Sequence, residues 1–167
     1  YKELQPEKYG DMVQHVIDKG NTPAGMHISI MVEEILQFLD IKPGQIGFDA
    51  TLGYGGHTRA MLERLQGQGH MYATDVDPEE SAKTRKRLAD LGFGEDLLTI
   101  KLQNFCTIDE IAEEVGGFDF ILADLGVSSM QIDNPKRGFS FKVDGPLDLR
   151  LNQQKGISAA ERLETID

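Results

Sequence analysis

The pattern of hydrophobic and polar positions predicts two helices near the start of the chain. Residues 7–19 and 30–39 carry apolar side chains at helical spacing, and residues that favour turns follow each segment. The first helix and the linker behind it form an N-terminal extension over residues 1–26.

Between residues 46 and 125, short apolar runs alternate with amphipathic stretches. The apolar runs predict strands and the amphipathic stretches predict helices. We expect strands over residues 46–51, 70–75, 97–102 and 118–125, and helices over residues 57–65, 78–91 and 108–115. This order is typical of right-handed crossovers, which build a parallel sheet with helices on both faces. The predicted fold class is therefore α/β.

From residue 134 onward, prolines and glycines interrupt the chain and no strand is predicted. Residues 158–166 can form a helix, because Ser158 is a good N-cap and Glu161 three residues later completes a capping box. A parallel sheet of this kind usually continues beyond four strands. The chain also begins at Tyr1 without a methionine, so we interpret it as part of a longer protein.

Composition narrows the class of protein. With 40% hydrophobic and 27% charged residues in 167, the chain can build a core, which disfavours disorder. Its single cysteine excludes an internal disulfide, and we expect no metal site. No segment approaches the roughly 20 apolar residues of a membrane helix, and the start does not resemble a secretory signal, so we expect a cytoplasmic protein. The net charge of −11 means that a nucleic acid would need a local basic patch.

A glycine-rich turn over residues 49–58 follows the first predicted strand. Glycines let the backbone approach a ligand, and the start of the next helix offers unpaired N–H groups to an anion. Thr58 stands where a dinucleotide fingerprint has its last glycine, and no lysine follows as in a P-loop, so neither motif is matched. An ordinary tight turn remains the alternative.

Acidic residues end two of the predicted strands. Asp75 lies roughly 20 residues beyond the glycines, where a carboxylate can bind ribose hydroxyls. The alternative for Asp75 or Asp77 is to cap the helix that starts at Pro78, and Asp77 is the stronger candidate. Asp124 ends the fourth strand at the same edge of the sheet, where capping or an ion pair is the alternative. Phe105 suits either an adenine ring or the core.

In this order, these features resemble the MraW-like S-adenosylmethionine-dependent methyltransferases, which methylate N4 of a cytosine in the decoding region of 16S ribosomal RNA. The resemblance runs from His27 onward and is carried by DATLGYGGHT, TDVDP, DLGVSSMQID at 124–133 and RGFSFKVDGPLDLRLN at 137–152. It implies a Rossmann-like class I methyltransferase sheet of which the first four strands are present. It also implies S-adenosylmethionine as cofactor, and small-subunit ribosomal RNA or the assembled small subunit as partner.

The resemblance further implies which residues contact the methyl donor: Gly53, Gly55, Gly56, His57, Asp75, Phe105, Asp124 and Gln131. For His57 the alternative is an ordinary residue of the first helical turn, whose backbone N–H is the group that matters. The glycines would pass close to its methionine part, Asp75 would hold the ribose and Phe105 would flank the adenine. Asp124 and Gln131 would lie near the amino acid end or the transfer site. Asp124 is the predicted catalytic residue that orients the amine, with Ser128 and Ser129 as weaker candidates.

In this interpretation, residues 27–133 are the first half of the cofactor-binding domain, and residues 134–167 are a lid loop and the start of an inserted substrate-recognition region. That last region carries basic and aromatic side chains that suit a local RNA-facing surface: Lys136, Arg137, Phe139, Phe141, Lys142 and Arg150. For the two phenylalanines, a lid over the cofactor is the alternative.

Alternative functions remain open at this level. The extension over residues 1–26 precedes the usual start of the family, which suggests a paralogous branch with another RNA or small-molecule target. A second alternative is a cofactor-binding module without catalysis. An unfinished sheet would also leave an edge exposed, which favours a homodimer.

Overall fold

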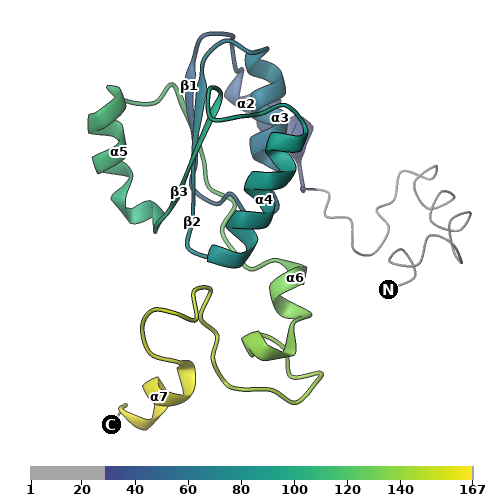
Figure 1. Cartoon of the computed structure of the whole chain (residues 1–167), viewed down its shortest axis with the longest axis vertical. Helices are drawn as coiled ribbons and strands as arrows, with labels where there is room; N and C mark the ends of the chain where they lie inside the picture. Colours follow the sequence, from purple (N-terminus) through teal and green to yellow (C-terminus); the bar gives the residue numbers. More distant parts are fainter. Residues whose placement is uncertain (1–28, 167) are drawn as a thin grey trace, which may run out of the picture.

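A computed structural model describes residues 29–166, except the side chains of residues 129 and 130 (Figure 1). The helix expected over residues 7–19 lies outside the described residues. None of the helices between residues 29 and 166 is long and apolar enough to cross a membrane.

The centre of the fold is a parallel sheet of four strands: β1 (Ile46–Asp49), β2 (His70–Asp75), β3 (Leu98–Leu102) and β4 (Phe120–Leu122). Their order in the sheet is β3-β2-β1-β4. The α/β fold class with a parallel sheet is thus confirmed. In the register, Asp49 of β1 pairs with Ala73 of β2 and with Leu122 of β4, so the carboxyl ends of these strands lie side by side.

Two strands, β1 and β4, end earlier than expected. The first ends at Asp49 because the Asp49 carboxylate accepts the backbone N–H of Thr51 at 3.0 Å and starts a turn. The fourth ends at Leu122 because the N–H of Asp124 donates to the Thr51 side chain at 2.8 Å instead of continuing the ladder. Both departures place polar groups at the edge where a ligand would bind.

Helices cover both faces of the sheet, as expected (Figure 1). On one face lie α2 (Val32–Leu39), α3 (Gly56–Leu65) and α4 (Pro78–Asp90), which bury Leu36, Met61 and Leu88 against β2 and β3. On the other face α5 (Ile108–Val115) packs Ile111 against Phe48 of β1. These apolar contacts fix the strands and leave their carboxyl ends uncovered by these helices.

Two α-helices, α4 and α7, begin with the side-chain caps that the sequence predicts. Asp77 caps α4 by accepting the N–H groups of Glu79 and Glu80, which confirms the capping alternative for this residue. Near the chain end, α7 (Ala159–Glu164) starts with the expected capping box of Ser158 and Glu161.

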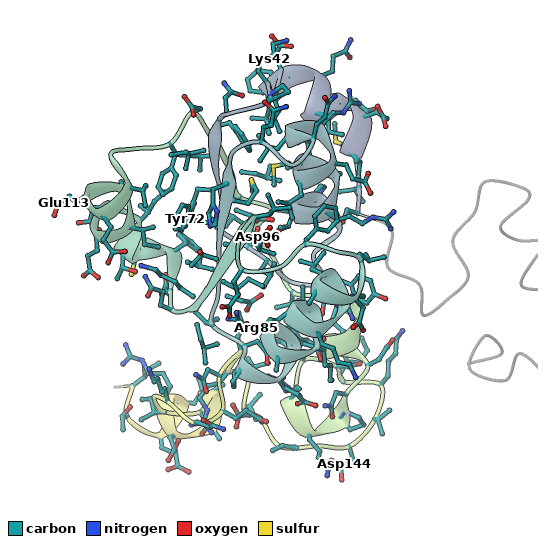
Figure 2. The ribbon with its side chains drawn as sticks, turned by 45° about the horizontal axis from the view of Figure 1, so that its top comes forward. Lys42, Tyr72, Arg85, Asp96, Glu113 and Asp144 are labelled. Atoms are coloured by element: carbon teal, nitrogen blue, oxygen red, sulfur yellow. The ribbon has the colours of Figure 1, made fainter. Side chains whose placement is uncertain are left out.

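The segment after β4 contains α6 (Ser129–Ile132), the short 3-10 turn η3 (Pro135–Arg137) and α7. It lies below the carboxyl ends of the strands in Figure 1. Figure 2 shows the same division, with Lys42 just before β1 at one end of the molecule and Asp144 at the other. The segment therefore lies at the edge of the sheet where the predicted site residues gather.

Candidate functional site

A cavity of about 290 Å³ opens at the carboxyl ends of the four strands. It lies where the strand order reverses, because β2 and β3 lie on one side of β1 and β4 on the other. Ligands of open parallel sheets bind at such a point. All eight residues predicted to contact a ligand line this one cavity: Gly53, Gly55, Gly56, His57, Asp75, Phe105, Asp124 and Gln131.

Asp75 links the glycine loop to the second strand. One carboxylate oxygen accepts the N–H of Gly53 at 2.8 Å and the other accepts the N–H of Asp77 at 2.9 Å. Burial raises the pKa of the Asp75 carboxyl, although these two backbone donors act in the opposite direction. Each carboxylate oxygen keeps a lone pair, so Asp75 can still accept hydroxyl groups from a ligand.

The glycines at the start of α3 are required by packing inside the protein. Gly55 has a φ of +81°, and a Cβ there would lie 2.7 Å from the Thr84 methyl group on α4. A Cβ on Gly56 would collide with the hydroxyl of Ser29, just before α2. The sequence indicated close approach to a ligand as the reason for these glycines, whereas the structure adds close approach of two protein segments.

We expect Gly55→Ala to lower the free energy of unfolding by about 2 to 4 kcal/mol, because overpacking costs about 1 to 3 kcal/mol and the left-handed backbone adds about 1 kcal/mol. Gly67→Ala is the matched control, because Gly67 also has a positive φ of +73° but no atom within 4 Å of the place that the added methyl group would take. Its cost should be that of the left-handed backbone alone, about 1 kcal/mol. Urea unfolding of both variants measures the difference, and equal losses would contradict the role of the Thr84 contact.

Asp124 follows β4 and faces the cavity with 44% of its side chain exposed. Its carboxylate Oδ2 lies 3.6 Å from Nδ1 of His57, a residue of the first turn of α3. The other ring nitrogen of His57, Nε2, lies 2.9 Å from the carbonyl oxygen of Ile30. Asp124 therefore has a neighbour in the same cavity with which it would form an ion pair only when the His57 ring is protonated.

A second carboxylate, that of Asp49, lies buried beside this pair. It accepts the hydroxyl of Thr58 at 2.6 Å as well as the N–H of Thr51. Burial raises the pKa of Asp49, while the hydrogen bonds and the nearby His57 act to lower it. The sequence predicts Asp49 at the end of a strand but does not reveal its contribution to the electrostatics of the site, because nothing in the pattern shows toward which face of the strand its side chain lies.

Gln131 lines the cavity, but both ends of its amide already have partners. Its Nε2 donates to Asp77 Oδ2 at 3.0 Å, and its Oε1 accepts the N–H of Ser128 at 2.9 Å. Arg137 donates to the same Asp77 oxygen at 2.7 Å and to the carbonyl of Leu151 at 2.7 Å. We call Asp77, Gln131 and Arg137 the Asp77 cluster. Its hydrogen bonds connect the segment after β4 to the start of α4.

The interpretation of Arg137 as part of an exposed basic surface is wrong, because only 4% of the residue is exposed. A cation in a loop is usually solvated, and the sequence carried no sign of the buried carboxylate that pairs with it. Arg150 is also paired, with Asp148, and this ion pair lowers the pKa of the Asp148 carboxyl. Lys136 and Lys142 are exposed, so the basic surface of this segment is smaller than expected.

Phe105 is 42% exposed and lines the cavity, so it does not belong to the core. It begins the 3-10 turn η2 (Phe105–Thr107), which Asn104 caps through its side chain. An exposed aromatic ring at this position suits stacking against a flat ligand such as a nucleobase.

Glu80 belongs to the site but is not among the residues that the sequence predicts there. It lies on the first turn of α4, lines the cavity, and is 7% exposed. Its Oε2 is buried without a hydrogen-bond partner among the described residues, while Oε1 accepts Lys83 at 2.9 Å. A buried acceptor of this kind is satisfied by a donor such as a ligand hydroxyl. With Asp75, Phe105 and the glycine loop, it makes the cavity suitable for a nucleoside.

A model of the MraW methylase family matches residues 24–167 of this chain. The chain is 84% identical over 166 residues to a protein of Agathobacter rectalis named ribosomal RNA small subunit methyltransferase H 1, and 74% identical over 166 residues to its namesake from Lachnoclostridium phytofermentans. Both matches cover 99% of this chain, so they extend into residues 1–26. They cover 48% and 45% of the relatives, so the chain spans about half of their length.

A solved protein-L-isoaspartate O-methyltransferase is similar in fold, with a TM-score of 0.50 and 12% identity. The similarity covers 58% of this chain and 29% of that protein. At this identity it supports the Rossmann-like methyltransferase fold alone.

Proposed function

Because the chain belongs to the MraW methylase family, we propose that it forms the cofactor-binding part of an S-adenosylmethionine-dependent methyltransferase acting on N4 of a cytosine in small-subunit ribosomal RNA. The observation that carries the proposal is the single cavity that gathers the eight residues expected to contact the methyl donor. The name of the relatives supports ribosomal RNA of the small subunit as the substrate class.

In the proposed reaction, S-adenosylmethionine supplies a methyl group that its sulfonium already activates. Asp75 and the unpartnered oxygen of Glu80 accept the ribose hydroxyls, and Phe105 stacks on the adenine. The backbone of Gly55 and Gly56, at the start of α3, lies beside the amino acid end.

Asp124, half exposed at the opposite wall of the cavity, accepts a hydrogen bond from the exocyclic amine and orients it. Thr51 supports this role because its hydroxyl holds the backbone N–H of Asp124. The protein's part is therefore to align the amine with the methyl group and to exclude water around both.

The substrate RNA needs positive charge that these residues provide only sparsely. The chain has a net charge of −11, and Arg137 and Arg150 are paired with carboxylates. We propose that sequence beyond this chain, or the assembled small subunit itself, supplies most of the RNA contact, and that the protein acts in the cytoplasm.

The sheet edge at β4 suggests how copies associate. Among the described strands β4 pairs with β1 alone, and its Ile121 is 51% exposed. A second copy that covers this edge would make a homodimer. Sedimentation of the full-length protein tests this, and a monomer with the edge protected from hydrogen exchange would contradict it.

Isothermal titration with S-adenosylmethionine, and with NAD as the competing ligand, tests the cofactor. Binding of NAD without S-adenosylmethionine would overturn the proposal. A methyl-transfer assay on undermethylated small subunits then separates an enzyme from a module that only binds the cofactor. The assay uses the full-length protein beside this chain, because the chain spans about half of its relatives.

We expect Asp75→Ala to weaken S-adenosylmethionine binding by about 1 to 3 kcal/mol, the range for lost hydrogen bonds to a charged group. Asp75→Asn keeps one acceptor oxygen and should lose less. Asp90→Ala is the control, because Asp90 is an exposed residue at the end of α4 that does not line the cavity. Titration of the three variants measures the effect, and unchanged affinity of Asp75→Ala would mean that other groups hold the ribose.

A further inference from the structure

We propose that His57 and Asp124 form a two-residue proton relay that receives the proton released when the amine is methylated. Asp124 faces the substrate, and His57 acts through it as a positioning and proton-storing residue. This inference rests on the proposed function and extends it, because it identifies where the proton goes.

The hydrogen bond between His57 and Ile30 determines which ring nitrogen carries the proton. A backbone carbonyl oxygen only accepts hydrogen bonds, so Nε2, at 2.9 Å from the oxygen of Ile30, must be the donor. In a neutral imidazole the other nitrogen, Nδ1, then has a lone pair and no proton. That lone pair lies on the side of Asp124, whose Oδ2 is 3.6 Å away.

Two acceptors that face each other at this distance are complementary only when a proton lies between them. The pair is therefore arranged to take up one proton, after which an imidazolium faces a carboxylate. The distance of 3.6 Å is too long for a hydrogen bond. Catalytic hydrogen bonds of a ligand-free protein often shorten when the substrate binds, so the separation is compatible with transfer.

The charges around His57 favour this uptake. Only 7% of His57 is exposed, and carboxylates approach it from two elements: Asp124 from the loop after β4 and the buried Asp49 from β1. The start of α3 presents backbone N–H groups that oppose a positive ring there. Two negative groups thus act against one partial positive charge, which supports a transient imidazolium inside the protein.

The proposed reaction transfers a methyl group to the amine and then a proton to the protein. The lone pair of the amine nitrogen forms a bond to the methyl carbon, while the carbon–sulfur bond breaks and leaves its electron pair on sulfur. The methylated nitrogen, now positively charged, releases one N–H proton to the Asp124 carboxylate. Asp124 passes this proton to Nδ1 of His57, and the imidazolium releases it to solvent after the product leaves.

His57→Gln is the informative variant. A glutamine amide can still donate to the Ile30 carbonyl, so the local structure is kept, but it has no nitrogen that takes up a proton. In the full-length protein we expect turnover to fall by about 10²-fold, the lower end for proton-transfer catalysis, with little change in affinity for S-adenosylmethionine. The pH profile of turnover is a second readout, because the variant should lose the part of the wild-type pH dependence that the imidazole contributes.

His70→Gln is the matched control. His70 is the first residue of β2, so it lies at the amino end of the strand, opposite to the cavity. Its ring contacts Thr99 and the carbonyl of Asp96. Wild-type turnover and pH dependence are expected for this variant. An equal loss of turnover and of cofactor affinity in His57→Gln would overturn the relay, because it would show a purely structural role, and so would unchanged turnover with an unchanged pH profile.

Nitrogen-15 NMR of the His57 ring gives a readout that needs no activity. Protonated Nε2 with bare Nδ1 in the neutral form supports the relay, whereas protonated Nδ1 overturns it. Failure of the proposed function is recognised separately, as a wild-type protein that does not bind S-adenosylmethionine or methylate small-subunit RNA.

Discussion

Asp77→Ala is expected to lower the free energy of unfolding by about 3 to 5 kcal/mol, the range for breaking a buried ion pair from one side. Asp77 is fully buried, caps α4 and accepts both Gln131 and Arg137. Its removal leaves the guanidinium of Arg137 inside the protein, where its remaining partners among the described residues are the Leu151 carbonyl and a Glu79 carboxylate oxygen 3.6 Å away. Denaturant unfolding, monitored by circular dichroism, measures the loss.

Asp77→Asn separates the cap from the ion pair. Oδ1 of Asp77 accepts the two N–H groups of α4, whereas Oδ2 accepts Gln131 and Arg137. An asparagine keeps the cap oxygen but turns an amide group toward these two donors. We expect Asp77→Asn to lose most of the stability that Asp77→Ala loses.

Arg59→Ala is the control for an ordinary ion pair. Arg59 pairs with Glu63 on the surface of α3, with about half of each side chain exposed. Its loss should cost about 1 kcal/mol or less. A near-wild-type stability of Asp77→Asn would contradict the importance of the Asp77 cluster and reduce Asp77 to a helix cap.

The Asp77 cluster combines an interaction that the sequence predicts with one that it does not. Asp77 was recognised as a helix cap, because capping is a local property that sequence spacing reveals. Its pairing with Arg137, 60 residues later, depends on how the segment after β4 folds back onto α4. No local pattern distinguishes a lysine or arginine that folds inward from one that stays in water, so Arg137 was assigned to the surface.

The helices and strands could be predicted because the sequence patterns that indicate them are local and repeated. Apolar runs predicted four strands, and β2 over His70–Asp75 has the predicted bounds. Proline and aspartate fixed the start of α4, and the capping box fixed that of α7. The strand order β3-β2-β1-β4 was not predicted, since it depends on contacts between distant segments.

The location of the site could be predicted for another reason. In a parallel sheet the loops that follow the strands all lie at the carboxyl ends of the strands. Residues such as Asp75 and Asp124 were therefore expected to lie close together. Interactions that support these residues could not be predicted from the sequence. The orphan oxygen of Glu80 and the contact between His57 and the Ile30 carbonyl depend on side-chain directions that only the packed structure provides.

Asp124→Ala should reduce turnover of the full-length protein by about 10²- to 10³-fold, the range for removing one preorganised polar group at a reacting centre. Affinity for S-adenosylmethionine should fall much less, because the proposed main role of Asp124 is to orient the amine at the transfer site. The backbone N–H of Asp124, which donates to Thr51, is retained in the variant, so the loop keeps its position. Single-turnover methyl transfer and isothermal titration measure the two quantities.

Asp124→Asn then distinguishes orientation from proton acceptance. An asparagine oxygen can still accept a hydrogen bond from the amine, but the amide does not take up its proton. If the relay with His57 operates, Asp124→Asn should be nearly as slow as Asp124→Ala, whereas recovery of turnover would leave Asp124 with orientation alone. Glu113→Gln, the same change on the exposed face of α5 (Figure 2), is the control and should retain wild-type turnover. Equal losses of turnover and of cofactor affinity in Asp124→Ala would instead place Asp124 at the amino acid end of the cofactor.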